Sequence, residues 1–136
     1  MRIEPYLCFE GRCEEAIEFY KKALGAEVQS MMRFQDVPGP DGASHAPPGS
    51  SNKIMHAMLR IGESNVLASD GQCTGKTNFG GITMALQVKD AAEAEKMFAA
   101  LADGGQVQMP LAETFWSPRF GMVADRFGVW WMVNAS

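Results

Sequence analysis

The chain has 136 residues, of which 46% are hydrophobic, and a formal net charge of −4. This length suits one compact domain, or two small lobes with a shared core. The acidic balance argues against binding to nucleic acid or anionic lipid, and no apolar run approaches the roughly 20 residues that a membrane-spanning helix needs. Three widely spaced cysteines indicate neither a disulfide framework nor a metal site, so we expect a cytoplasmic protein.

The first half of the chain predicts a strand, a helix, another strand and then a hairpin. The helix is the clearest element, because its apolar residues fall on one face, acids occupy its first turn and Gly25 follows its end. The hairpin turns at Gly62. The predicted ranges are 3–9 for the first strand, 14–24 for the helix, 27–34 for the second strand, and 54–61 and 65–70 for the hairpin.

Residues 36–52 are dense in proline, glycine and serine, a composition that sustains neither a helix nor a strand ladder. Loops of this length are often lids over a site or mobile connections, and both interpretations stay open. His45 lies inside this loop and is more simply a solvated side chain than a ligand.

The second half repeats the order of elements. A strand is expected over 81–88, a helix over 93–102 behind the capping box of Asp90 and Glu93, and a short strand over 106–109. The final hairpin joins strands 120–124 and 129–133 around a turn that contains Gly128. Residues 115–134 hold all three tryptophans, so much of the apolar area available for burial is concentrated there.

The two halves align with each other. Glu15 matches Glu93 at an offset of 78 residues, and the hairpin starting at His56 matches the one starting at Phe120 at an offset of 64. The longer first half is explained largely by the 36–52 loop. A duplicated βαβββ unit follows, with one module over about residues 1–77 and the other over about residues 78–136.

Several motifs give the chain a family resemblance. They are Glu15-Ala16-Ile17-Glu18-Phe19-Tyr20 in the first half and, in the second, Trp116-Ser117, Arg119-Phe120-Gly121 and Asp125-Arg126-Phe127-Gly128. In these residues the chain resembles the vicinal oxygen chelate superfamily, also called glyoxalase/bleomycin resistance/dioxygenase proteins, and within it the PhnB-like branch. The resemblance implies an α+β fold of two tandem βαβββ modules, with curved mixed sheets around a cleft, and commonly a homodimer.

Metal-dependent members of this superfamily bind a divalent ion through His or Glu on the first and last strands of each module. Carried onto this chain by the resemblance, those positions are Pro5, Ala68, Thr83 and Met132. Neither proline nor alanine offers a donor atom, thioether suits a hard cation poorly, and one hydroxyl alone holds no metal well. We therefore expect no tightly bound metal and no other cofactor, which departs from the family pattern.

Side chains alternate along a strand, so the residues that share a face with Ala68, Thr83 and Met132 follow from their spacing. The expected cleft side adds Val66, Asp70, Ala85, Gln87, Trp130 and Asn134, and the expected helix side holds Leu67, Met84, Leu86, Val88, Trp131 and Val133. Trp116 and Arg119 either cap the cleft or are a packing tryptophan and a solvated arginine. The predicted ligand-binding residues are Asp70, Thr83, Gln87, Trp116, Arg119, Trp130 and Met132.

His56 and Asp70 are the candidate catalytic residues. An inward His56 near Asp70 would serve as a general base or a single metal ligand, whereas the simpler alternative is a histidine bonded to backbone. A one-residue slip in register would reverse the face of His56. Among the cysteines, Cys8 is expected in the core, and Cys13 lies near a helix start where the dipole could activate a thiol against the opposing charges of Glu14 and Glu15.

Taken together, these residues predict a protein that binds a small organic molecule in its cleft without a tightly held metal, either to sequester it or to transform it. The alternative is a metal-dependent lyase, isomerase or dioxygenase-type enzyme with atypical ligands, such as His56 with Asp70 or Glu4. A third possibility is an interaction module whose cleft is filled by its own side chains.

Overall fold

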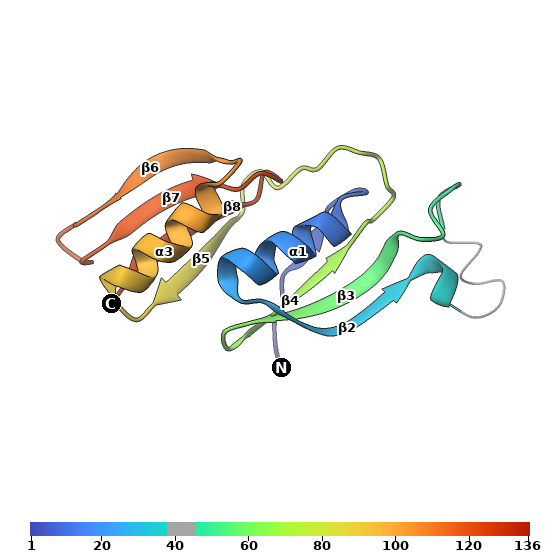
Figure 1. The fold of residues 1–136 in the computed structure, drawn as a ribbon, viewed down its shortest axis with the longest axis horizontal. Helices are drawn as coiled ribbons and strands as arrows, with labels where there is room; N and C mark the ends of the chain where they lie inside the picture. Colours follow the sequence, from blue (N-terminus) through green and yellow to red (C-terminus); the bar gives the residue numbers. More distant parts are fainter. Residues whose placement is uncertain (38–45) are drawn as a thin grey trace. The chain divides into compact units, whose positions relative to one another are not determined.

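The computed structural model describes residues 1–37 and 46–136, so the central part of the predicted loop, including His45, lies outside the described residues. The chain divides into two compact units, Met1–Thr77 and Asn78–Ser136, and this division falls where the sequence places the boundary between modules. Figure 1 shows the two units, each with one long helix and one sheet. No helix among the described residues is long and apolar enough to cross a membrane.

Unit 1 contains a four-stranded sheet in the order β1-β4-β3-β2. Strand β1 runs parallel to β4, and the other neighbouring strands are antiparallel. The elements are β1 (Tyr6–Cys8), α1 (Cys13–Leu24), β2 (Glu27–Arg33), the short 3₁₀ helix η1 (Phe34–Asp36), β3 (Ile54–Ile61) and β4 (Ser64–Ser69).

Unit 2 repeats this topology, with the strand order β5-β8-β7-β6 and a parallel pairing between β5 and β8. Its elements are β5 (Thr83–Val88), α3 (Ala91–Ala102), β6 (Gln106–Ala112), β7 (Phe120–Ala124) and β8 (Trp130–Ala135). Each unit is thus a βαβββ module of mixed strands and one long helix, and the predicted α+β fold is confirmed.

Local sequence explains where the helices begin and end. Helix α1 has Glu14 and Glu15 in its first turn and ends at Gly25, whose φ of 68° is the left-handed conformation that glycine adopts at little cost. Helix α3 begins after Asp90, whose side chain accepts a hydrogen bond from the Glu93 backbone N–H at 2.8 Å. The predicted helix start at Glu93 was therefore two residues late.

Two strands, β1 and β6, differ most from their predicted lengths. Strand β1 covers only Tyr6–Cys8 rather than 3–9, and Pro5, which lacks an N–H group, contributes only its carbonyl oxygen to the Leu67 N–H at 2.9 Å. Strand β6 extends to Ala112 and so includes Pro110. An edge strand tolerates proline because one row of its N–H groups has no partner strand, and β6 is the edge of its sheet.

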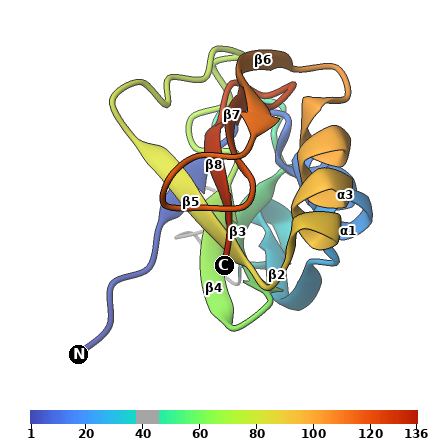
Figure 2. The same ribbon diagram turned by 90° about the vertical axis from the view of Figure 1, so that its left-hand side faces the viewer.

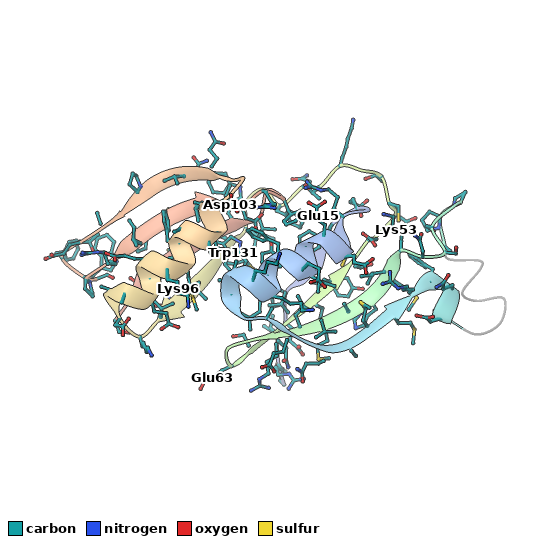
Figure 3. The ribbon with its side chains drawn as sticks, viewed as in Figure 1. Glu15, Lys53, Glu63, Lys96, Asp103 and Trp131 are labelled. Atoms are coloured by element: carbon teal, nitrogen blue, oxygen red, sulfur yellow. The ribbon has the colours of Figure 1, made fainter. Side chains whose placement is uncertain are left out.

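Each sheet has one face covered by the helix of its own unit and one that this helix leaves uncovered, called here the open face. Figure 2 shows α3 against one face of the unit 2 sheet. In β8, Trp131, Val133 and Ala135 are buried while Trp130, Met132 and Asn134 are only partly buried. The predicted alternation of β8 is therefore correct, with Trp131, labelled in Figure 3, on the helix side.

In unit 1 the predicted alternation was wrong by one residue. Val66 and Ala68 are buried and pair with buried Leu59 and Ala57, so they face α1 rather than the open side. Tyr6 and Leu67, which pair with each other, take the open face instead.

The physical reason for this error lies in the connections between elements. The helices keep the offset of 78 residues that the motifs gave, because Cys13 and Ala91 both begin a helix. The connection before α1 is residues 9–12, whereas the one before α3 is only residues 89–90. That difference of two residues leaves the face of a strand residue unchanged, because side chains alternate with a period of two. The hairpin turns differ by an odd number instead: residues 62–63 join β3 to β4, whereas residues 125–129 join β7 to β8. A constant offset between β4 and β8 therefore assigns the β4 residues to the wrong face.

Candidate ligand-binding faces

Asp70 directly follows β4 and accepts hydrogen bonds from three backbone N–H groups. Its Oδ1 accepts hydrogen bonds from the backbone N–H groups of Gly11 at 3.0 Å and Cys13 at 2.7 Å. Its Oδ2 accepts from the Ile54 N–H at 2.7 Å, and the residue is only 1% exposed. The hydrogen-bonding capacity of this buried carboxylate is therefore used by three backbone donors.

This placement corrects the expectation that Asp70 shares the ligand side of the sheet. Its carboxylate lies on the side of the N-terminus of α1, and His56 lies on the open face, so the structure does not bring the two predicted catalytic residues together on one face. The parallel pairing of β4 with β1 explains this placement: Asp70 directly follows β4, and residues 9–12 lead from β1 into α1 beside it.

His56 lies on the open face of unit 1, where it meets Tyr6. The Tyr6 Oη lies 3.3 Å from the His56 Nδ1, and the ring centroids are 5.6 Å apart. Tyr6 is 49% exposed, so the two rings are accessible. Sequence reasoning missed Tyr6 as a site residue, although strand alternation from buried Leu7 would have found it.

Two further residues place polar atoms near this strand. Glu4 precedes β1, and its Oε1 lies 3.0 Å from the Arg2 Nε. Its Oε2 is inaccessible to solvent and has no hydrogen-bond partner among the described residues. Cys8 is exposed at the end of β1, which corrects the expectation of a core cysteine.

The open face of unit 2 brings together four of the predicted ligand-binding residues. Thr83 pairs with Trp130, and Ala85 pairs with Met132. Gln87 pairs with Asn134, and the Asn134 Nδ2 donates to the Gln87 Oε1 at 2.8 Å. This face therefore presents an indole and a thioether beside a hydroxyl and two linked amides.

Asn134 has one unsatisfied atom. Its Oδ1 is inaccessible to solvent and lacks a hydrogen-bond partner among the described residues. A buried acceptor without a donor costs free energy, so native proteins usually supply a donor from protein, water or ligand. A bound N–H or O–H group would satisfy the Asn134 Oδ1 after the side chain turns toward the open face.

Trp116 and Arg119 come from the connection between β6 and β7 but point to different surroundings. Trp116 is 56% exposed and packs edge-on against Phe120 with ring centroids 5.4 Å apart. The Arg119 Nε donates to the Glu95 Oε1 of α3 at 3.1 Å. Arg119 therefore lies on the helix side of unit 2, away from the residues of the open face, whereas Trp116 extends the aromatic surface through Phe120.

The described residues do not supply a conventional metal site. No group of three or more His, Cys, Asp or Glu side chains among them could hold an ion. After the register correction, Leu67 rather than Ala68 occupies the open position on β4, and a leucine is no better as a ligand. The donor chemistry therefore does not fit the divalent ion of the metal-dependent relatives.

The cysteine near the helix start is not an activated thiol. Cys13 is fully buried, and this burial raises its pKa, with a further contribution from the nearby Asp70 carboxylate. A raised pKa keeps the thiol protonated and unreactive. The alternative of a reactive Cys13, left open by the sequence, receives no support from its surroundings.

Two modules of the same topology, each with one open face, define a tandem βαβββ protein. Residues 2–133 match the family model described as "Glyoxalase/Bleomycin resistance protein/Dioxygenase superfamily", and the chain belongs to that superfamily. The curated protein YjdN of Escherichia coli (strain K12) is 38% identical, over 98% of this chain and 95% of that protein.

Solved structures give the same result. Protein PA1353 from Pseudomonas aeruginosa has 43% sequence identity and a TM-score of 0.85, over 100% of this chain and 98% of that one. A Bacillus cereus structure named "Putative 3-demethylubiquinone-9 3-methyltransferase, PhnB protein" has 26% identity and a TM-score of 0.81, over 100% of both chains. The resemblance to PhnB-like proteins is thereby confirmed.

Proposed function

We propose that this protein binds a small organic molecule on the open faces of its sheets and holds no metal tightly. The observation that carries the proposal is the open face of unit 2, where Trp130 and Met132 lie beside the amide pair of Gln87 and Asn134. Small-molecule sites are mostly apolar walls with a few fixed polar groups. The Asn134 Oδ1, which has no hydrogen-bond partner among the described residues, supplies one such group once its side chain turns toward the open face.

The first experiment is a fragment screen by ligand-observed NMR and thermal shift on the purified chain. We expect binders that carry an N–H or O–H group on an apolar body. The Asn134→Ala variant should bind these fragments roughly tenfold more weakly, because a hydrogen bond worth about 1 kcal/mol or more is lost. The matched control is Asn52→Ala, an exposed asparagine whose backbone carbonyl, not its side chain, accepts from Arg33.

The second experiment addresses the metal. Elemental analysis of protein purified without chelators should find no divalent ion in stoichiometric amount. A stoichiometric ion that is lost in His56→Gln would instead support the alternative of an enzyme with atypical ligands. That result would overturn the metal-free part of the proposal but leave the ligand-binding part standing.

We favour sequestration of the ligand over its transformation, because Asp70, one of the two predicted catalytic groups, is occupied by three backbone donors. A methyltransferase activity is not proposed, since Gly104 and Gly105 follow helix α3 rather than a strand and form no cofactor loop at a helix N-terminus. Recovery of an identified ligand chemically unchanged after incubation supports sequestration, and a new product rejects it.

We also propose a cytoplasmic homodimer. The free thiols of Cys8, Cys13 and Cys73 suit a reducing compartment. Ile82 is 67% exposed and Phe115 is 96% exposed, and large exposed apolar side chains favour association. Sedimentation equilibrium should give twice the 14.8 kDa mass of one chain. A monomer at all concentrations tested would reject the dimer.

A further inference from the structure

Tyr6 and His56 form a fixed pair on the open face of unit 1. They come from β1 and β3, which are separated by β4, so each ring reaches over the middle strand toward the other. Leu67 of β4 pairs with Tyr6 on one side and with Met58 on the other. The polar pair therefore lies beside an apolar patch made of Leu67 and Met58.

The hydrogen-bonding capacity of this pair depends on one proton. When the imidazole is neutral and Nδ1 accepts from the Tyr6 hydroxyl at 3.3 Å, only the Nε2–H is left as a donor. When the imidazole is protonated, Nδ1–H donates to the Tyr6 Oη. The phenolic O–H then no longer donates to His56 and is available to a ligand. The pair then offers two donors, Nε2–H and Oη–H, together with a positive charge. Two donors and one positive charge match the two oxygens and negative charge of a carboxylate.

We propose that Tyr6 and His56 bind the carboxylate of a small organic acid whose apolar body rests on Leu67 and Met58, and that one proton is taken up by His56 on binding. This inference rests on the proposed ligand-binding function and names the ligand class for the open face of unit 1. Histidine suits this role because its charge changes near neutral pH.

The surroundings of the pair leave the imidazole as the group that supplies the charge. The Glu4 Oε1 lies 3.0 Å from the Arg2 Nε. Arg60 lies four residues from His56 along β3, and its Nε donates to the Gly62 carbonyl oxygen at 3.3 Å. The side chains that β4 places on this face are uncharged. On β2, Met32 lies opposite His56. The titratable and charged groups around the pair are Glu4, Arg2, Cys8, Arg60 and Glu27.

The test uses benzoate as the probe and benzamide as its uncharged counterpart. Isothermal titration of the full chain near neutral pH, in two buffers of different ionisation enthalpy, reports the protons taken up on binding. We expect benzoate to bind with uptake of up to about one proton and benzamide to bind without uptake. Tyr6→Phe should weaken benzoate binding roughly tenfold, because one donor to a charged group is lost.

His56→Gln should abolish proton uptake while circular dichroism shows an unchanged fold. Two controls isolate the effect: His45→Asn removes the other histidine of the chain, and Arg60→Gln removes a positive charge from the same face. Both control variants should still take up a proton when benzoate binds. Uptake that persists in His56→Gln, or benzoate binding that is insensitive to Tyr6→Phe, overturns the inference.

The same experiment separates this inference from the proposed function. If benzoate does not bind but neutral fragments from the screen do, the protein is a ligand-binding protein and the carboxylate assignment is wrong. If neither benzoate nor any fragment binds, the proposed function itself fails and the inference fails with it.

Discussion

A carboxylate near a possible site is often taken as a catalytic group, and Asp70 shows how neighbouring backbone changes that interpretation. Its two oxygens accept from Gly11, Cys13 and Ile54, which belong to the start of α1 and the start of β3. The anion also lies at the N-terminus of α1, where the helix dipole favours negative charge. Sequence alone identified Asp70 as polar and near a strand end but could not show these donors, since they come from distant parts of the chain.

Asp70→Asn should therefore destabilise the fold without any ligand present. An amide retains one acceptor oxygen, but its NH₂ group faces a backbone N–H, so at least one hydrogen bond to a charged acceptor is lost. We expect a loss of about 2 to 3 kcal/mol in the free energy of unfolding, measured by urea denaturation.

The matched control is Asp90→Asn, which changes another aspartate that accepts from a helix N-terminus. Asp90 is exposed and makes one such bond, to the Glu93 N–H, and asparagine caps helices about as well as aspartate. The loss of unfolding free energy in Asp90→Asn should stay below about 0.5 kcal/mol. Equal losses in the two variants would contradict the structural role of Asp70.

Cys13 gives a prediction about alkaline pH. Burial raises the pKa of this thiol above its ordinary value of 9.0, so the folded chain keeps the proton at a pH where the unfolded chain releases it. Stability must then fall as pH rises above that ordinary value, by up to about 1.4 kcal/mol per pH unit. Denaturation at several pH values above about 9 should show a smaller decline for Cys13→Ala than for the unchanged chain. Parallel declines would contradict the buried, protonated thiol.

At the scale of elements, the packing of α3 on its sheet depends on one glycine. A Cβ atom added to Gly121 in β7 would lie 2.8 Å from Phe98 Cε2 and 3.0 Å from Leu111 Cα. Phe98 belongs to α3 and is buried, so it has little room to move. Gly121→Ala should cost about 1 to 3 kcal/mol of unfolding free energy through overpacking, measured by thermal or urea denaturation.

Gly80→Ala serves as the control for Gly121→Ala. A Cβ atom at Gly80 meets only Asn78 Oδ1, at 3.4 Å, which is ordinary contact. The backbone at Gly80 is not in the left-handed region, so alanine is tolerated there and reduces the freedom of the unfolded chain. This variant should be neutral or slightly stabilising. A destabilised Gly80→Ala would show that the cost reflects loss of glycine rather than lack of space.

Helices and strands were predictable from the sequence because the spacing of apolar residues and the positions of glycine and capping residues indicate the same elements. Helix α1 was found to within one residue at its start, and the strands of both hairpins were found to within two residues. The face of each strand was harder to predict. Both β4, with Val66-Leu67-Ala68, and β8, with Trp130-Trp131-Met132, are apolar at every one of these positions, so neither sequence determines its own pleat. The faces were assigned from the family positions instead, and the assignment was correct at Met132 but wrong at Ala68.

At the scale of the whole molecule, charge limits the possible partners. The net charge of −4 gives the chain no attraction for a phosphate backbone. Fluorescence anisotropy with labelled duplex DNA should show no binding that weakens as salt increases, even at about 50 mM salt. A strong salt-dependent signal would contradict the assignment to small-molecule ligands.

The duplication and the family could be predicted from the sequence, since repeated motifs and the Asp125–Gly128 turn carry that information locally. The composition of the unit 2 face was also largely predictable, because the family positions Thr83 and Met132 lie on it, and Gln87 and Trp130 follow from them by the alternation of side chains along a strand. The Tyr6–His56 pair was not predictable from the sequence, because it depends on β4 lying between β1 and β3. A contact between side chains on two strands that flank a third depends on the order of strands in the sheet. A single sequence gives little direct information about that order.

All three tryptophans lie in unit 2, and all three cysteines lie in unit 1. The unmodified chain therefore carries two separate spectroscopic reporters. Intrinsic emission excited at the indole band follows events in the second half alone, while the rate of labelling of the buried Cys13 thiol follows opening of the first half alone. One denaturation series read by both signals will show whether the duplicated modules unfold as a single cooperative body or one after the other, with no substitution introduced.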